Sequence, residues 1–188
     1  MISLREIVIP LFGAYRLALM DAKGAAYIGN DDAAFWRSFI AAGLVLPFYG
    51  IILAAKYASH DELSSSLRFI SVELIAYVIA WVAFPLLMVT VARMLDREDK
   101  YFGFICAYNW ASVLQNVVYL PVVFLIFMGV DSIATLGLFI LMGLLVYTWF
   151  IAKTVLEIDG IAAAGLVVMD LLISLLVTSY ADTLILRG

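Results

Sequence analysis

Few residues in this chain have side chains that could carry chemistry, and the most informative of them is Asp170. It lies ten residues after Gly160, which opens a long apolar segment, so a helix would carry it about 15 Å into a bilayer. An ionised carboxylate is costly near the bilayer midplane, and no Lys or Arg lies at that depth in another apolar segment. We therefore expect Asp170 to be largely protonated at neutral pH.

Asp170 also begins a polar stripe, because Ser174, Thr178 and Asp182 follow it at steps of four residues. An earlier apolar segment carries a matching stripe, formed by Tyr108, Asn109, Ser112, Gln115, Asn116 and Tyr119. Ser112 would lie at the depth of Asp170 if both segments cross the membrane in the same direction. We predict that the two stripes face each other and share hydrogen bonds worth about 0.6–2 kcal/mol each.

The alternative is a proton or ion path through Asp170, Gln115, Asn116 and Glu73. Glu73 would lie about 6 Å from the outer end of its segment. Ionisable residues inside a membrane are functional candidates by default. Two carboxylates without a series of basic residues beside them are few groups for a proton or ion pathway. The sequence therefore favours hydrogen bonding between helices over transport, and a contact to a partner subunit is the third possibility.

The remaining residues give little support to catalysis. The chain has one cysteine, Cys106, inside an apolar segment, and one histidine, His60, beside Asp61 and Glu62 in a loop. It contains no nucleophile–base pair, no metal-ligand motif and no phosphate-binding glycine loop. The formal net charge is −4, with no basic run of the kind that binds nucleic acid. We expect a protein that is not an enzyme, with no cofactor, no metal and no nucleic-acid partner.

The elements that must position these residues are membrane-spanning helices. Hydrophobic residues make up 66% of the chain, against about 45–50% apolar residues in soluble domains. Five apolar segments, at about 35–57, 69–94, 102–129, 132–152 and 160–186, each exceed the roughly 20 residues that a spanning helix needs. The predicted fold class is all-α, an integral membrane bundle of five transmembrane helices with an N-terminal amphipathic helix.

The chain divides at about residue 35. Residues 1–34 form an N-terminal helix and loop, and residues 35–188 form the five-helix transmembrane domain. Apolar residues from Leu4 to Leu19 recur at helical spacing, so residues 3–23 are predicted to form a helix that docks on the bundle or binds lipid or a partner. Pro10, Arg16 and Asp21 interrupt this segment, which does not resemble a signal peptide.

The distribution of Lys and Arg predicts the orientation. Eight of them belong to the N-terminal region and to the loops after the second and fourth segments, and three belong to the other side. Because basic residues stay in the cytoplasm, we expect a cytoplasmic N-terminus and an outer C-terminus.

The five segments, the motif Ala107-Tyr108-Asn109-Trp110 and the entry Asp159-Gly160 into the last segment resemble the Yip1 family, in particular its bacterial members. The resemblance covers about residues 35–186. It implies a five-helix protein with a cytoplasmic N-terminus, here in the bacterial inner membrane. Eukaryotic members are non-enzymatic adaptors in vesicle traffic that bind small GTPases. This chain has no Asp-Leu-Tyr-Gly-Pro motif, so GTPase binding does not carry over.

Taken together, the sequence predicts a non-catalytic, multi-pass membrane protein that acts as a Yip1-like scaffold, an adaptor or an accessory subunit of a membrane complex. The alternative is a small transporter or channel that uses Asp170. The expected partners are the lipid bilayer and either other membrane-protein subunits or further copies of this chain.

Overall fold

The computed structural model describes residues 3–58, 66–130 and 133–186, which form helices and their connections without any strand. The elements are α1 (Leu4–Ala18), the 3-10 helix η1 (Ala22–Tyr27), α2 (Asp32–Ser38), α3 (Ile40–Ala58), α4 (Ser66–Met94), the 3-10 turn η2 (Glu98–Lys100), α5 (Tyr101–Phe127), α6 (Ile133–Val155) and α7 (Gly160–Leu186). Within these residues, five helical stretches are long and apolar enough to cross a membrane. The predicted all-helical, five-span fold is confirmed.

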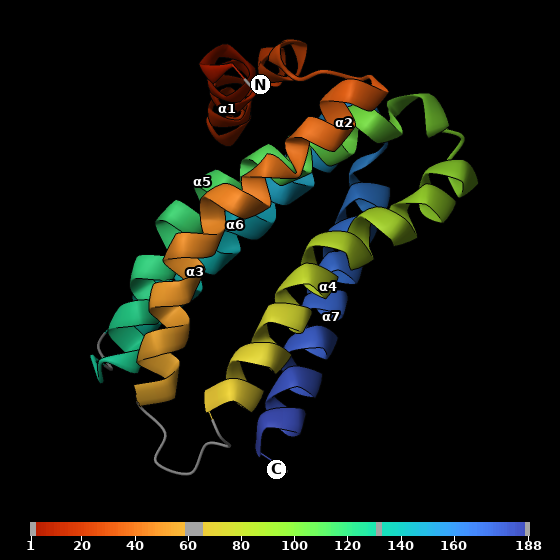
Figure 1. Ribbon diagram of the computed structural model, residues 1–188. Helices are drawn as coiled ribbons and strands as arrows, with labels where there is room; N and C mark the ends of the chain where they lie inside the picture. Colours follow the sequence, from red (N-terminus) through yellow and green to blue (C-terminus); the bar gives the residue numbers. More distant parts are fainter. Residues whose placement is uncertain (1–2, 59–65, 131–132, 187–188) are drawn as a thin grey trace.

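The long helices form two groups (Figure 1). One group contains α3, α5 and α6, with α5 packed against both of the others. The second is the pair α4 and α7, which lie side by side. The contact between α6 and α7 joins the groups along one side, whereas α3 and α4 lie farther apart along their backbones and meet through side chains such as Tyr49 and Tyr77. This arrangement leaves room between the groups, on the side away from α6.

The main apolar core lies at the end of the bundle beside α1, which we call the N-terminal end (Figure 1). Its fully buried side chains include Met88 near the end of α4, Phe104 and Ile105 at the start of α5, Ile151 near the end of α6, and Leu156 directly after α6. Burying large side chains of this kind contributes about 1.5–3 kcal/mol each against water. In lipid, where apolar burial drives association less, the close packing itself holds the helices together.

Helix α1 is docked on this core. Ala14 and Leu17 are fully buried, and the hydroxyl of Tyr147 in α6 donates to the carbonyl of Ala14 at 2.7 Å. The opposite side of α1 leaves an apolar row exposed, formed by Leu4, Val8, Phe12, Tyr15 and Leu19. The helix ends at Ala18, earlier than the predicted 3–23, because Met20 adopts a φ of +58° and the chain turns into η1.

The connection from α1 to the first span is more ordered than the loop predicted for residues 24–34. Asn30 accepts a hydrogen bond from the backbone N–H of Gly103 at 2.6 Å and donates to the carbonyl of Asp99 at 2.9 Å. Asp31 caps α2 by accepting from the N–H of Ala34 at 2.8 Å. The segment is therefore fixed to the start of α5.

The close approach of α1 and η1 depends on two glycines. A Cβ on Gly24 would lie 2.5 Å from the carbonyl oxygen of Gly13 and 2.9 Å from the backbone nitrogen of Leu17.

We expect Gly24→Ala to lower the free energy of unfolding by about 1–3 kcal/mol, because rigid backbone would have to move. Thermal unfolding in mild detergent would measure this loss. Gly50→Ala is the matched control, since nothing lies within 4 Å of its added methyl; equal melting temperatures for the two variants would refute the prediction.

Candidate functional site

The space between the two helix groups is a cavity of about 770 Å³. It is lined by α3, α4, α5 and α7. Small-molecule sites in proteins usually measure about 300–1,000 Å³. The cavity is therefore large enough for an organic ligand.

Asp170 lines this cavity from α7. The hydroxyl of Tyr108 in α5 donates to its Oδ1 at 2.8 Å. This bond reaches between the two groups, since α5 and α7 do not pack closely along their length. A neutral hydroxyl is the hydrogen-bond partner that the described residues give this carboxyl group.

The polar stripes of α5 and α7 lie on opposite walls of the cavity. The lining residues of α5 include Tyr108, Ser112, Asn116 and Tyr119, and those of α7 include Asp170, Ser174, Thr178 and Asp182. Steps of three and four residues keep each set on one helix face. The predicted stripes thus border a shared space, and in the part of the chain that the structure describes the Tyr108–Asp170 hydrogen bond joins them directly across it.

The other polar residues of α5 point elsewhere, which corrects the prediction that all of them face Asp170. The Asn109 amide donates to the Ser38 hydroxyl at 2.8 Å, and the Gln115 amide donates to the Thr148 hydroxyl at 2.9 Å. Neither Asn109 nor Gln115 lines the cavity. The physical reason is helical rotation of about 100° per residue, which turns a residue beside the stripe toward a different neighbour.

The end of the cavity farthest from α1 contains a charged network. Lys56 Nζ lies 2.6 Å from Glu73 Oε1 and 2.7 Å from Asp182 Oδ1, so one cation bridges α3, α4 and α7. The hydroxyl of Tyr49 donates to the other oxygen of Glu73 at 2.9 Å. The Glu73 side chain is only 4% exposed, and that of Asp182 is 43% exposed. Glu73 therefore has a cation partner in Lys56, which the sequence analysis did not assign to it.

Sequence reasoning missed Lys56 as a functional residue because it was counted only as an orientation charge. The sequence feature that could have identified it is its short distance from the end of its helix, since the two acids also lie toward an end of theirs. Lys56 lies two residues before the end of α3 at Ala58, Glu73 lies seven residues after the start of α4 at Ser66, and Asp182 lies four residues before the end of α7 at Leu186. Antiparallel neighbours bring such positions toward the same end of a bundle, where opposite charges pair.

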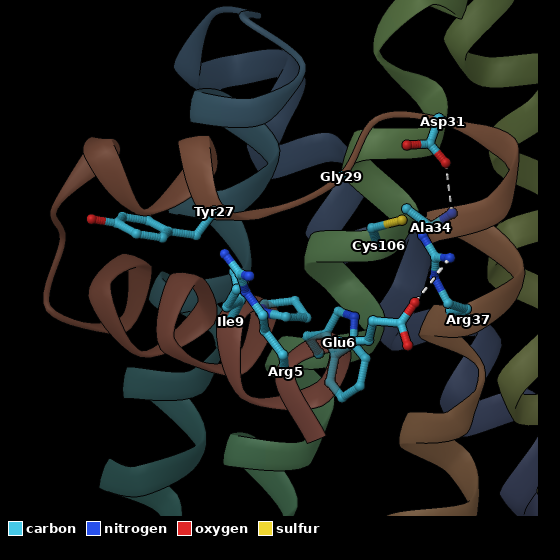
Figure 2. Close-up of a pocket in the computed structure, with 11 residues that line it drawn as sticks. Arg5, Glu6, Ile9, Tyr27, Gly29, Asp31, Ala34, Arg37 and Cys106 are labelled. Atoms are coloured by element: carbon cyan, nitrogen blue, oxygen red, sulfur yellow. Dashed lines mark hydrogen bonds and ion pairs between the residues drawn. The ribbon is translucent and has the colours of Figure 1, made fainter. Parts of the chain in front are cut away.

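A second, smaller hollow of about 250 Å³ lies at the N-terminal end, between α1, α2 and α5. Figure 2 shows Glu6 and Arg37 pointing toward each other. Arg37 Nη1 lies 3.3 Å from Glu6 Oε1. Cys106 forms part of its lining. The two arginines that border it, Arg5 and Arg37, are matched by the carboxylates Glu6 and Asp31, so this hollow has no excess charge for recognising an ion.

A helix cap and an ion pair, both formed by exposed side chains, hold the loops at the N-terminal end of the bundle. Asp159 caps α7 by accepting from the N–H groups of Ile161 at 2.8 Å and Ala162 at 2.9 Å. These bonds stabilise the ionised form and lower the pKa of Asp159. Lys100 Nζ lies 2.9 Å from Glu157 and lowers the pKa of that carboxyl in the same way. These pairs fix the loops that join α4 to α5 and α6 to α7.

Within the described residues, His, Cys, Asp and Glu side chains form no group that could hold a metal ion. The cluster His60, Asp61 and Glu62 lies outside those residues. Comparison with protein-family models, with curated proteins and with solved structures finds no match to this chain. The resemblance to the Yip1 family stays a prediction from the sequence.

The Tyr108–Asp170 bond can be measured by a double-mutant cycle of Tyr108→Phe and Asp170→Ala, each of which removes one partner of the bond. We expect a coupling free energy of about 0.6–1.7 kcal/mol in reversible unfolding, because both groups lie inside the bundle and bond each other. Ser112→Ala is the control, because the Ser112 hydroxyl bonds the carbonyl of Tyr108 in its own helix. Additive effects of the two substitutions would show that the bond contributes nothing.

Lys56→Met should lower the free energy of unfolding by about 3 kcal/mol, because it leaves the buried Glu73 without its cation. Lys56→Met combined with Glu73→Gln should recover most of this loss. Asp182→Asn is the matched control with a smaller expected effect, since the Lys56–Glu73 pair survives and Asp182 is the more exposed acid. Thermal unfolding of the four proteins tests the network; equal losses for Lys56→Met and Asp182→Asn would contradict it.

Proposed function

We propose that this chain is a non-catalytic, multi-pass membrane protein that works as a Yip1-like scaffold, an adaptor or an accessory subunit of a membrane complex. We place it in the bacterial inner membrane, with the N-terminus in the cytoplasm and the C-terminus outside. Its partners are the lipid bilayer and either other membrane proteins or further copies of the chain. Neither catalysis nor a cofactor forms part of this proposal.

One observation carries the proposal: the polar groups inside the bundle join helices to one another. Asp170 ties α7 to α5, Gln115 ties α5 to α6, Asn109 ties α5 to α2, and Lys56 ties α3 to α4 and α7. A reactive centre would gather such groups at one point. Here they are spread along the bundle, as expected of groups that hold a framework together.

The surface of α4 supports a role as a subunit. Leu67, Ile70, Leu74 and Val78 are exposed on α4 at steps of three and four residues, so they form one continuous apolar row. The helix packs closely against α7 and meets α3 through side chains on its other face, such as Glu73 and Tyr77. This row is free to contact lipid or a neighbouring membrane helix.

Transport or channel activity through Asp170 is the second candidate, and the cavity is the observation that favours it. Asp170, Ser174, Thr178, Ser112, Asn116 and Glu73 all line the cavity. A transporter needs a binding site of this kind near the bilayer midplane. Opening the cavity at the end farthest from α1 would require the Lys56 network to break.

The two candidates can be separated by purifying the full chain from its own membranes in mild detergent and weighing the intact assembly by native mass spectrometry. The scaffold proposal expects a stoichiometric partner subunit or a homo-oligomer, which Leu74→Trp on the α4 row should dissociate. Leu176→Trp, an exposed position of α7, is the control. A monomer, together with solute flux in proteoliposomes that Asp170→Asn abolishes, would overturn it in favour of transport.

The proposed orientation predicts which connections a membrane-impermeant maleimide can reach in intact cells. In a Cys106→Ala background, which removes the single cysteine, Asp96→Cys should be protected and Leu186→Cys should be labelled. Permeabilised cells provide the control, because both positions should then react. The reverse labelling pattern in intact cells would show that the chain has the opposite orientation.

A further inference from the structure

The cavity between α3, α4, α5 and α7 has an excess of acidic groups. Among the described residues that line it, the ionisable carboxyl groups are Glu73, Asp170 and Asp182, and the cation is Lys56. Lys56 bonds both Glu73 and Asp182, so one positive charge already serves two carboxylates. Asp170 is bonded to the neutral hydroxyl of Tyr108. A cation that entered the cavity would find a carboxyl group whose partner on the protein carries no charge.

Aromatic rings form much of the rest of the lining. Tyr49, Tyr77 and Trp81 stand in sequence along the α3–α4 wall, with ring centroids 4.9 Å apart for Tyr49 and Tyr77 and 6.1 Å apart for Tyr77 and Trp81. Tyr108 and Tyr119 line the α5 wall. The negative faces of aromatic rings attract cations, and rings together with carboxylates are the means by which proteins recognise ammonium groups.

The cavity suits an organic cation better than a metal ion. In the described part of the chain, no three metal-ligating side chains come close enough to hold a metal. The volume of about 770 Å³ is that of an organic ligand. Aliphatic side chains such as Ile52, Leu53 and Val123 also line the cavity, and they would pack against the carbon skeleton of such a molecule.

We propose that this cavity is a binding site for an organic ammonium ion, with Asp170 as its counter-ion and the rings of Tyr49, Tyr77 and Trp81 as its wall. The ammonium group belongs either to a free amine or to a lipid headgroup. The cation supplies the charge partner that the described residues do not give Asp170, so binding offsets the cost of an ionised carboxylate inside the membrane. The proposal concerns binding alone, and it holds whether the protein is a scaffold or a transporter.

The test is isothermal titration of the purified full chain in an uncharged maltoside detergent. The probe is benzyltrimethylammonium, and phenylmethanesulfonate is the control of similar shape and opposite charge. We expect saturable binding of the ammonium ion and none of the sulfonate. Asp170→Asn should weaken binding by about tenfold or more, since it removes the charge. The asparagine oxygen can still accept from Tyr108, so this variant should keep its fold.

Two further variants separate the site from general effects. Trp81→Leu should also weaken binding, because it removes one ring from the wall, and Glu157→Gln should not, because Glu157 lies in the exposed loop between α6 and α7. Melting temperatures of all variants establish that each is folded. The proposal fails if the folded wild-type protein does not bind the ammonium ion, if the sulfonate binds equally well, or if Asp170→Asn keeps full affinity.

Nanodiscs distinguish the two sources of the ammonium group. Titration in phosphatidylglycerol alone is compared with titration in phosphatidylglycerol mixed with phosphatidylethanolamine. Loss of probe binding in the mixed nanodiscs would identify the lipid headgroup as the occupant. Equal affinity in both would identify a free amine.

Discussion

Hydrocarbon offers no hydrogen-bond partner, and the rest of this structure follows from that constraint. Each polar side chain taken into the bundle must find its partner on the protein, or the cost of burying it goes uncompensated. Lys56 meets Glu73 and Asp182, and Tyr108 meets Asp170. These partners belong to different helices, so satisfying the polar groups also fixes how the helices are arranged.

The two ends of the bundle are held in different ways. At the N-terminal end, side chains such as Phe104, Ile151 and Leu156 interdigitate in an apolar core. At the other end, the charged network of Lys56 holds α3 to α4 and α7 around a cavity. Apolar packing is insensitive to a bound ion, whereas a charged network responds to one. The cavity end is therefore where ligand binding could change the spacing of the helix groups.

The proposed roles as scaffold and as ammonium-binding protein are compatible. A scaffold presents surfaces to other subunits, and the exposed apolar row of α4 is such a surface. The same helix supplies Glu73, Tyr77 and Trp81 to the cavity. Since α4 has one face toward the cavity and another toward the membrane, a ligand that shifts this helix would also shift the outward surface. That coupling would need no path other than the helix itself.

The sequence by itself determined the class of fold and the positions of the spans. Long apolar runs specify transmembrane helices because their length and composition match the thickness and polarity of the bilayer, independently of what lies beside them. It also placed Asp170, Ser112 and Asn116 on stripes, because helical periodicity is local. Only the tertiary structure decided which stripes meet. The cation for Glu73, the separate partners of Asn109 and Gln115, and the cavity itself all depend on how far apart neighbouring helices lie. A rotation of one residue, about 100°, or a small splay between α3 and α4 changes those contacts without changing any local pattern.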